Sequence, residues 1–224
     1  RYGSWSRGIT KKAPTISSAV ASVRTIWYKA TVLSNVTASP ANSKSKRQLV
    51  KKGTKVTVVT YGGTCKVQLP NKDMVYISLS KLNFTSSIYT KKSYSKKLKE
   101  NYVNQSGYSS STKYLIWVSQ YTLSVNVFKG QQGSWKLVRR MPCVIGKDGK
   151  TSTGTFRLCR KDYAYGGVRI YFTWNEQKQW GNSFHRRVDG HTRGAYSHGC
   201  VRLSDADLSY INNTCPMGTT VVSY

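Results

Sequence analysis

Acidic residues are scarce in this chain. It has 8 Asp and Glu against 36 Lys and Arg among 224 residues, a formal net charge of +28 at pH 7. Such an excess predicts a polyanionic partner, either nucleic acid or a surface that carries phosphate or carboxylate groups. The basic residues are scattered along the whole chain. Because no RNA-binding aromatic signature or zinc-finger spacing accompanies them, we expect no specific recognition of nucleic acid.

Long hydrophobic runs are also missing. No stretch of apolar residues is long enough to span a bilayer, and no signal peptide is visible. We therefore expect no transmembrane segment in this chain. The abrupt start at Arg1 is compatible with a processed or truncated precursor.

Closely spaced cysteine pairs are absent as well. The five cysteines form no CxxC pair that would indicate zinc or a redox dithiol: Cys65, Cys143, Cys159, Cys200 and Cys215. An odd number leaves at least one thiol outside any intramolecular disulfide. Cys200 is the candidate free thiol, and we expect the other four to be buried apolar residues rather than disulfide partners.

Histidine is rare, yet all three histidines lie within 15 residues before Cys200. His198 belongs to the segment Ser-His-Gly-Cys-Val-Arg-Leu over residues 197–203, and His185 lies a short way upstream. A thiolate is the nucleophile of cysteine chemistry, and a histidine that takes the thiol proton completes the minimum set for acyl transfer. Gly199 would let the backbone approach a substrate closely. Four arginines near the segment are expected to favour a thiolate electrostatically: Arg186, Arg187, Arg193 and Arg202.

A zinc site is the alternative interpretation of this region, because imidazole and thiolate are zinc ligands. The candidate ligands are His185, His191, His198 and Cys200. Closed structural zinc sites show repeated short-spaced ligand pairs, and only His198 and Cys200 form such a pair. The surrounding positive charge would also repel a dication. We expect neither a metal ion nor another cofactor.

Short β-like segments dominate the first half of the chain. Residues 1–24 are rich in Ser, Thr, Lys and Gly without a sustained period, which predicts a tail. The segments 55–60, 65–69 and 74–77 are apolar–polar runs separated by turn residues, which favours a small β-barrel over residues 25–85. Residues 86–112 read as a connector with one short basic helix over 94–103, and we expect the charge run at 96–99 to face solvent.

Strands return from Lys113. The apolar run 114–118 predicts a strand buried on both faces, whereas 123–128 alternates as a half-buried strand does. Residues 135–138 predict the return strand of a hairpin, and 168–174 and 219–223 predict further strands. Residues 205–212 are the only helical segment expected in this half, with Ser204 as its N-cap. The sequence therefore predicts a mainly β second domain over 113–224.

Two resemblances sharpen this picture. His185 followed by Ser197-His198-Gly199-Cys200-Val201-Arg202 resembles the signature of L,D-transpeptidases. Gly146-Lys147 with the segment 150–156 is similar to the family's Gly-Lys…Thr-Pro-x-Gly-x-Phe element at the active site, and 216–222 is similar to its closing Gly-Thr-x-Val strand. Residues 49–58 resemble bacterial Src-homology-3-type domains, which usually bind cell-wall material. These resemblances imply a mainly β protein, with a β-sandwich-like catalytic domain preceded by a small Src-homology-3-like β-barrel.

The transpeptidase resemblance implies a role for each residue of the segment. Cys200 would be the nucleophile, and His185 rather than His198 the base. Oxyanion and substrate binding would fall to Ser197, His198, Gly199 and Arg202. Two departures from the family pattern stand out. Ser152 replaces a proline, which should cost loop rigidity, and Arg186 replaces the small residue after the base, which leaves the partner that orients His185 undefined.

The resemblance also implies a reaction. In the family, the cysteine attacks the carbonyl of the third residue in a peptidoglycan tetrapeptide stem and expels D-Ala, and an amine of a second stem then gives a 3→3 cross-link. Water as the acceptor would make the enzyme an L,D-carboxypeptidase, and a non-catalytic basic wall-binding protein is the alternative from another class. The implied partners are stem peptides and anionic cell-wall polymers. The implied location is the cell wall outside the membrane, after removal of an export signal that this chain does not contain.

Overall fold

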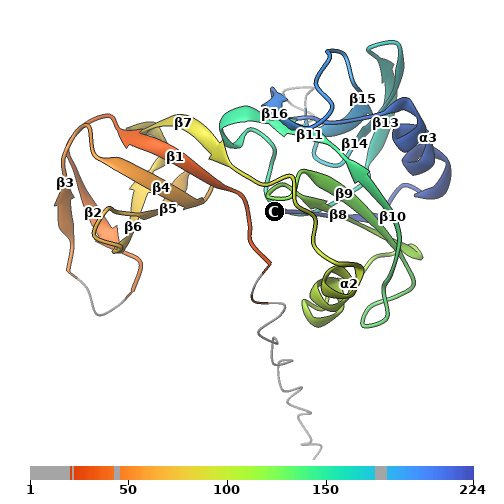
Figure 1. Cartoon of the computed structure of the whole chain (residues 1–224), viewed down its shortest axis with the longest axis horizontal. Helices are drawn as coiled ribbons and strands as arrows, with labels where there is room; N and C mark the ends of the chain where they lie inside the picture. Colours follow the sequence, from red (N-terminus) through yellow and green to blue (C-terminus); the bar gives the residue numbers. More distant parts are fainter. Residues whose placement is uncertain (1–20, 22, 43–45, 175–180) are drawn as a thin grey trace, which may run out of the picture.

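The computed structural model describes residues 21, 23–42, 46–174 and 181–224. The tail predicted over 1–24 lies outside the described residues except for positions 21, 23 and 24. Figure 1 shows two parts, an N-terminal sheet and a larger C-terminal half, joined by the segment that follows β7. Among the described residues, no helix combines the length and apolarity needed to cross a membrane.

The N-terminal part is a single antiparallel sheet with strand order β3-β2-β6-β5-β4-β1-β7. Its strands alternate buried and exposed positions because one face packs on an apolar core, which includes Val58, Val67 and Ile77. The strands predicted at 55–60, 65–69 and 74–77 are confirmed as β4, β5 and β6. The bounds are β1 Trp27–Val32, β2 Val36–Pro40, β3 Gln48–Val50, β4 Lys55–Thr60, β5 Thr64–Gln68, β6 Met74–Ser78 and β7 Leu82–Ile88, with the short 3-10 helix η1 at Leu79–Lys81.

The C-terminal half contains two sheets, which confirms the mainly β class expected there. One sheet has the order β10-β9-β8-β18-β12, and the other has the order β13-β14-β15-β17-β11-β16. Apolar side chains from both sheets share one core, among them Ile116, Val127, Phe184 and Val201. The first sheet comprises β8 Tyr114–Ser119, β9 Ser124–Lys129, β10 Lys136–Pro142, β12 Gly154–Arg157 and β18 Thr220–Ser223. The second comprises β11 Val144–Gly146, β13 Arg160–Ala164, β14 Gly167–Tyr171, β15 Ser183–Arg186, β16 Gly194–Ser197 and β17 Val201–Leu203, and the 3-10 helix η2 spans Lys147–Gly149.

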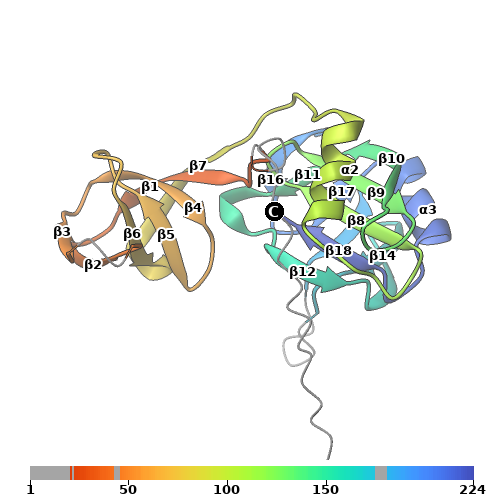
Figure 2. The same ribbon diagram turned by 90° about the horizontal axis from the view of Figure 1, so that it is seen from below.

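Helix α2, at Lys96–Gln105, covers the outer face of the first sheet (Figure 2). Val103 packs with Trp117, Phe128 and Trp135 in a second apolar cluster on this face. The half-buried strand predicted at 123–128 is therefore wrong, because β9 is buried on both faces. The prediction that the charge run at 96–99 faces solvent is also wrong in one position, since Lys99 is 1% exposed. It lies one turn before Val103, on the side of α2 that meets the sheet.

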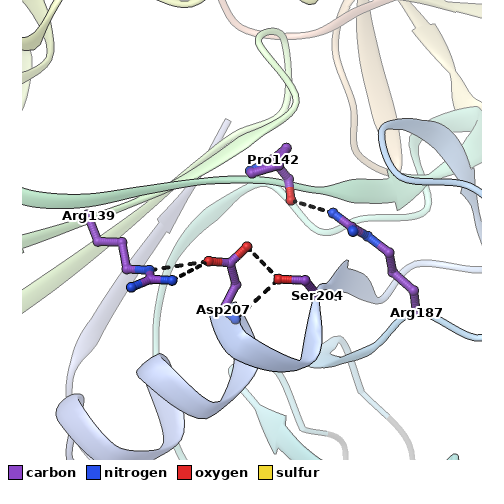
Figure 3. A network of polar contacts seen from close by, with 5 residues as sticks. All are labelled: Arg139, Pro142, Arg187, Ser204 and Asp207. Carbon is purple, nitrogen blue, oxygen red and sulfur yellow. Dashed lines mark hydrogen bonds and ion pairs between the residues drawn. The ribbon is translucent and has the colours of Figure 1, made fainter.

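Helix α3, at Asp205–Thr214, confirms the helix predicted at 205–212 together with its cap. Ser204 Oγ accepts a hydrogen bond from the backbone N–H of Asp207 and donates one to Oδ2 of the same residue at 2.7 Å. Asp207 in turn accepts from the Arg139 guanidinium on β10 at 2.8 Å (Figure 3). The cap therefore also ties α3 to the first sheet.

The burial of the cysteines agrees with the expectation from the sequence at all but one position. All five thiols are free, and Cys65, Cys143 and Cys215 are buried as expected. Burial raises the pKa of Cys143 and of Cys215 to about 12, which makes them poor nucleophiles near neutral pH. The expectation of a buried Cys159 is wrong, because this residue lies between edge strands β12 and β13 and is exposed.

Candidate active site

Two neighbouring parallel strands bring the predicted nucleophile and base together. β15 pairs with β17 so that Phe184 lies opposite Val201 and His185 opposite Arg202. Cys200 immediately precedes β17. Because alternate residues of a strand share a face, Ser183 and His185 lie on one side of β15 and Phe184 on the other. Ser183 Oγ donates a hydrogen bond to Cys200 Sγ at 3.3 Å.

The side chains around Cys200 enclose a small cavity of about 70 Å³. Every side chain that the sequence analysis assigned to catalysis or to oxyanion and substrate binding lines it, and Gly199 lies between the lining residues His198 and Cys200 in the chain. Its lining consists of Tyr165, His185, Val188, Ser197, His198, Cys200 and Arg202. A pocket of this size accommodates a reacting carbonyl group rather than a whole peptide.

His185 is buried and held in one tautomer. Its Nδ1 lies 2.7 Å from the carbonyl oxygen of Arg186, which can only accept, so Nδ1 carries the proton and Nε2 keeps its lone pair. Burial, together with the positive charges of Arg202 and Arg169, lowers the pKa of His185 to about 4. The imidazole is therefore neutral at pH 7 and able to accept a proton.

The partner that orients His185 is thus the backbone of the next residue. The Arg186 side chain points elsewhere: it donates to Asp205 at 2.9 Å and to the carbonyl of Gly166 at 3.3 Å. Arg186 in place of the family's small residue therefore does not disturb His185, because any residue at this position has the same backbone carbonyl.

Tyr165 is a site residue that the sequence analysis missed. Its ring lies over His185 with 4.5 Å between the ring centroids. It occupies the two-residue turn of the β13–β14 hairpin, where Tyr165 has φ 58° and Gly166 has φ 72°. Positive φ at both central positions is the geometry of a type I′ turn, and it is unfavourable for a residue with a side chain. The Tyr-Gly-Gly sequence at this turn was the available signal.

The backbone at Gly199 is packed against the protein itself. With φ +137°, a Cβ at this position would lie 2.5 Å from Asn182 Nδ2 and 2.8 Å from the carbonyl oxygen of Lys150. The close approach expected at this glycine is therefore to its own chain. Ser197 Oγ donates to the Cys200 carbonyl at 2.6 Å and accepts from the Gly199 N–H at 3.1 Å. Ser197 thus shapes the loop that carries the thiol.

A second set of residues supports this loop: Thr151, from the segment 150–156 expected at the site, and Asn182, which the sequence did not indicate. Thr151 Oγ1 donates to the Gly199 carbonyl at 2.6 Å and accepts from the Gly146 N–H at 2.7 Å. Asn182 Oδ1 accepts from the Ser152 N–H at 2.6 Å, a bond that a proline at this position could not make. This hydrogen bond fixes the backbone at Ser152, so Asn182 supplies the loop rigidity that the proline would otherwise give.

Of the four arginines expected to surround the thiol, only Arg202 lines the cavity. Arg202 forms an ion pair with Asp189, and its buried Nε has no hydrogen-bond partner among the described residues. Arg187 donates to the Pro142 carbonyl at 3.3 Å (Figure 3) and Arg193 to the Leu123 carbonyl at 3.3 Å, while Arg186 pairs with Asp205. These three arginines therefore do not contact the thiol, and their electrostatic influence on Cys200 stays a prediction.

The zinc alternative lacks a ligand set in the part of the chain that the structure describes. No three side chains of His, Cys, Asp or Glu gather there in a way that could hold a metal ion. His191 stacks on Tyr196, with 3.9 Å between the ring centroids, and does not line the cavity of His185 and Cys200.

One family model and several solved structures are similar to this chain. The family model of the YkuD L,D-transpeptidase catalytic domain matches residues 113–222. A fused Zn-dependent amidase/peptidase/peptidoglycan-binding protein from Clostridium acetobutylicum is 31% identical over 58% of this chain and 59% of that chain, with a TM-score of 0.46. An L,D-transpeptidase from Xylanimonas cellulosilytica is 19% identical over 51% of this chain and 62% of that chain, with a TM-score of 0.39.

A third structure, an L,D-transpeptidase from Mycobacterium smegmatis, is 13% identical over 93% of this chain and 86% of that chain, with a TM-score of 0.41. The chain spans less than two thirds of the length of the Clostridium and Xylanimonas structures. None of the curated proteins matches it. Residues 113–222 of this chain belong to the YkuD family of L,D-transpeptidase catalytic domains, a family that acts on cell-wall peptidoglycan.

Proposed function

We propose that this protein is a peptidoglycan L,D-transpeptidase in which Cys200 is the nucleophile and His185 the general base. One observation carries the proposal: a neutral, backbone-oriented imidazole and a thiol line the same 70 Å³ cavity. A thiol and a positioned base are the requirements of acyl transfer through a thioester.

In the first half-reaction, His185 Nε2 takes the thiol proton and Cys200 Sγ attacks the carbonyl carbon of the third stem residue. The tetrahedral oxyanion needs N–H donors. Because the Gly199 N–H already donates to Ser197, the proposed donors are the N–H groups of His198 and Cys200. His185 then gives its proton to the departing nitrogen, so that the C–N bond breaks, D-Ala leaves and a thioester remains.

In the second half-reaction, the amine of another stem attacks the thioester carbonyl. A C–N bond forms, the C–S bond breaks, and the amine proton returns through His185 to Sγ. The product is a 3→3 cross-link. Water in place of the amine gives a free carboxylate, the L,D-carboxypeptidase outcome. Arg202 Nε is a buried donor without a partner among the described residues, and we assign it to a substrate carbonyl or carboxylate.

The wall is the proposed location and the proposed partner. The net charge of +28 favours binding to anionic wall polymers. We assign this binding to residues 25–85 as a Src-homology-3-like accessory domain, with residues 86–112 as the connector to a catalytic domain at 113–224. Export across the membrane is part of this proposal, since the substrate lies outside it.

The test is intact-mass spectrometry after incubation with a tetrapeptide stem or with a carbapenem, a class that acylates the cysteine of this family. We expect one adduct on the unaltered protein, none on Cys200→Ala, and an unchanged adduct on Cys159→Ala, which removes the exposed thiol. His185→Gln should slow acylation by about 10²–10⁴-fold. D-Ala release without dimer formation would identify a carboxypeptidase. No adduct on the unaltered protein would refute the enzyme proposal and favour a non-catalytic wall-binding protein.

A further inference from the structure

A second and much larger cavity lies beside the thiol cavity. It has a volume of about 580 Å³ and is lined by Tyr61, Gly149, Lys150, Ser152, Thr153 and His198. His198 lines both cavities and so stands between them. Tyr61 is the only lining residue that comes from the N-terminal sheet, where it immediately follows β4.

The Tyr61 ring is fixed by other aromatic residues of its own sheet. It packs edge-on against Tyr28, with 6.2 Å between ring centroids, and against Phe84 at 5.6 Å. Tyr28 is itself 1% exposed. A ring held in this way loses little conformational freedom when a ligand packs against it.

Tyr61 also contacts the catalytic half directly. A Cβ at Gly149 would lie 2.3 Å from the Tyr61 ring, and Gly149 has φ +72°, so only glycine allows this contact. Figures 1 and 2 both show β7 of the N-terminal sheet approaching the end of the catalytic half that holds β16. Residues of β7 contact η2, which contains Gly149.

The wall of this cavity is continuous with the loop that carries the thiol. Lys150 and Thr151 follow Gly149, and Thr151 holds the Gly199 carbonyl through a 2.6 Å hydrogen bond. A ligand in the large cavity would therefore lie next to the backbone that positions Cys200.

We propose that this cavity binds the acceptor stem peptide, and that Tyr61 makes the N-terminal sheet part of the substrate site. The inference rests on the proposed function. The 70 Å³ cavity holds the thioester carbonyl, and Cys200 does not line the larger one, so the larger cavity suits the substrate that arrives after acylation. The exposed Lys150 ammonium pairs with a stem carboxylate, the Tyr61 and His198 rings pack on the aliphatic side chain that ends in the amine, and Ser152 and Thr153 bind peptide groups.

The first experiment measures how the thioester is partitioned between the acceptor amine and water. Tyr61→Ala and Lys150→Gln are expected to lower the ratio of transfer to hydrolysis about tenfold, a loss of about 1.4 kcal/mol of binding, and to leave the acylation rate within about twofold. Tyr61→Phe keeps the ring and should retain the ratio. Tyr76→Ala is the matched control, because Tyr76 is an exposed tyrosine on β6 of the same sheet.

The second experiment needs no acylation. A tripeptide stem that carries the amine but has no D-Ala leaving group is titrated into Cys200→Ala, alone and combined with Tyr61→Ala or Lys150→Gln. We expect the Kd to rise about tenfold for both combinations and to stay unchanged with Tyr76→Ala. Lys150 is exposed, so its variant tests the cavity even where the Tyr61 variant fails to fold.

Two results would overturn the inference. One is that Tyr61→Ala and Lys150→Gln both give the same transfer ratio and the same Kd as the Tyr76→Ala control. The other is an equal loss of acylation and transfer, which would place the donor stem in this cavity. Failure of the unaltered protein to form a thioester refutes the proposed function instead, and the titration of Cys200→Ala still decides whether the cavity binds an amine-bearing stem.

Discussion

At the residue scale, a backbone contact and burial together prepare His185 for its proposed role as the base. The carbonyl of Arg186 selects the tautomer, and burial together with nearby guanidinium groups keeps the ring neutral. Ser183, two residues earlier on the same face of β15, donates to the sulfur atom. Both contacts belong to one short strand, so the proposed base and the support for the proposed nucleophile share a rigid element.

The pH dependence of acylation tests the state of His185. Its pKa is lowered to about 4, and only the neutral ring accepts the thiol proton. As the pH falls, the acylation rate should therefore stay level through pH 6.5 and decline near pH 4. Single-turnover acylation followed by mass spectrometry measures this acidic limb of the pH–rate profile. Arg202→Gln removes a charge that lowers this pKa, so its limb should move to higher pH. A limb centred near 6.5 in the unaltered protein would contradict the assignment.

Ser183→Ala tests the hydrogen bond to sulfur. A bond to a charged group contributes about 1.5–3 kcal/mol, so loss of this donor should slow acylation about 10–100-fold. The comparison is with Cys159→Ala, a change at a residue outside the cavity. Circular dichroism checks that both variants fold. An acylation rate equal to that of the control would show that Ser183 has no part in stabilising the sulfur.

At the scale of elements, the site is a junction between β15, β17 and the segment from β11 to β12. The parallel pair β15–β17 aligns His185 with Arg202, while Thr151 holds the loop before β17 from the other side. Helix α3 begins directly after β17, and its Ser204 cap anchors the end of that strand. Cys200 is therefore held at both ends of its loop by different elements.

Thr151→Val tests that support, because it keeps the shape of the side chain and removes the hydroxyl. The Gly146 N–H and the Gly199 carbonyl would both lose their buried partner, at about 1–3 kcal/mol each. We expect the free energy of unfolding, measured by urea denaturation, to fall by about 2–6 kcal/mol, and acylation to fall with it. Thr155→Val is the control, since Thr155 is exposed on β12. Equal stability of the two variants would show that the Thr151 bonds do not hold the loop.

At the scale of the whole molecule, the net charge and the contact between the two parts both agree with the proposed action on an anionic cell wall. The excess of 36 basic over 8 acidic residues runs through both parts of the chain, and the N-terminal sheet contacts the catalytic half through Tyr61 and Gly149. A protein of this charge is drawn to an anionic polymer at long range. The contact between the two parts would bring substrate held at the sheet close to Cys200.

Retention on purified cell-wall sacculi tests the role of this charge. Electrostatic attraction acts over about 10 Å at 0.1 M salt but only about 3 Å at 1 M. We expect nearly complete retention at low salt, little retention at 1 M salt, and reduced retention on sacculi stripped of phosphate-containing polymers. Pelleting assays measure the bound fraction. Retention that survives 1 M salt would show that the net charge does not drive wall binding.

Local signals in the sequence were sufficient to predict much of this structure. Strands β4, β5, β6, β8 and β18 follow from short apolar patterns, and the α3 cap follows from one serine before a helical segment. His185 and Cys200 were identified from residue type, order and family resemblance. Each of these inferences depends on neighbours in sequence, where periodicity, capping and motif spacing are visible.

Tertiary structure alone decided which groups meet across the chain. Lys99 and the outer face of β9 are buried because α2 folds onto the first sheet. Ser183 and Thr151 reach the Cys200 loop from 17 and 48 residues away in sequence, at Cys200 and Gly199 respectively. Arg186, Arg187 and Arg193 bond instead to partners up to 71 residues away in the sequence. Such pairings depend on which strands become neighbours across long stretches of sequence, and a local pattern of charge or hydrophobicity does not specify that.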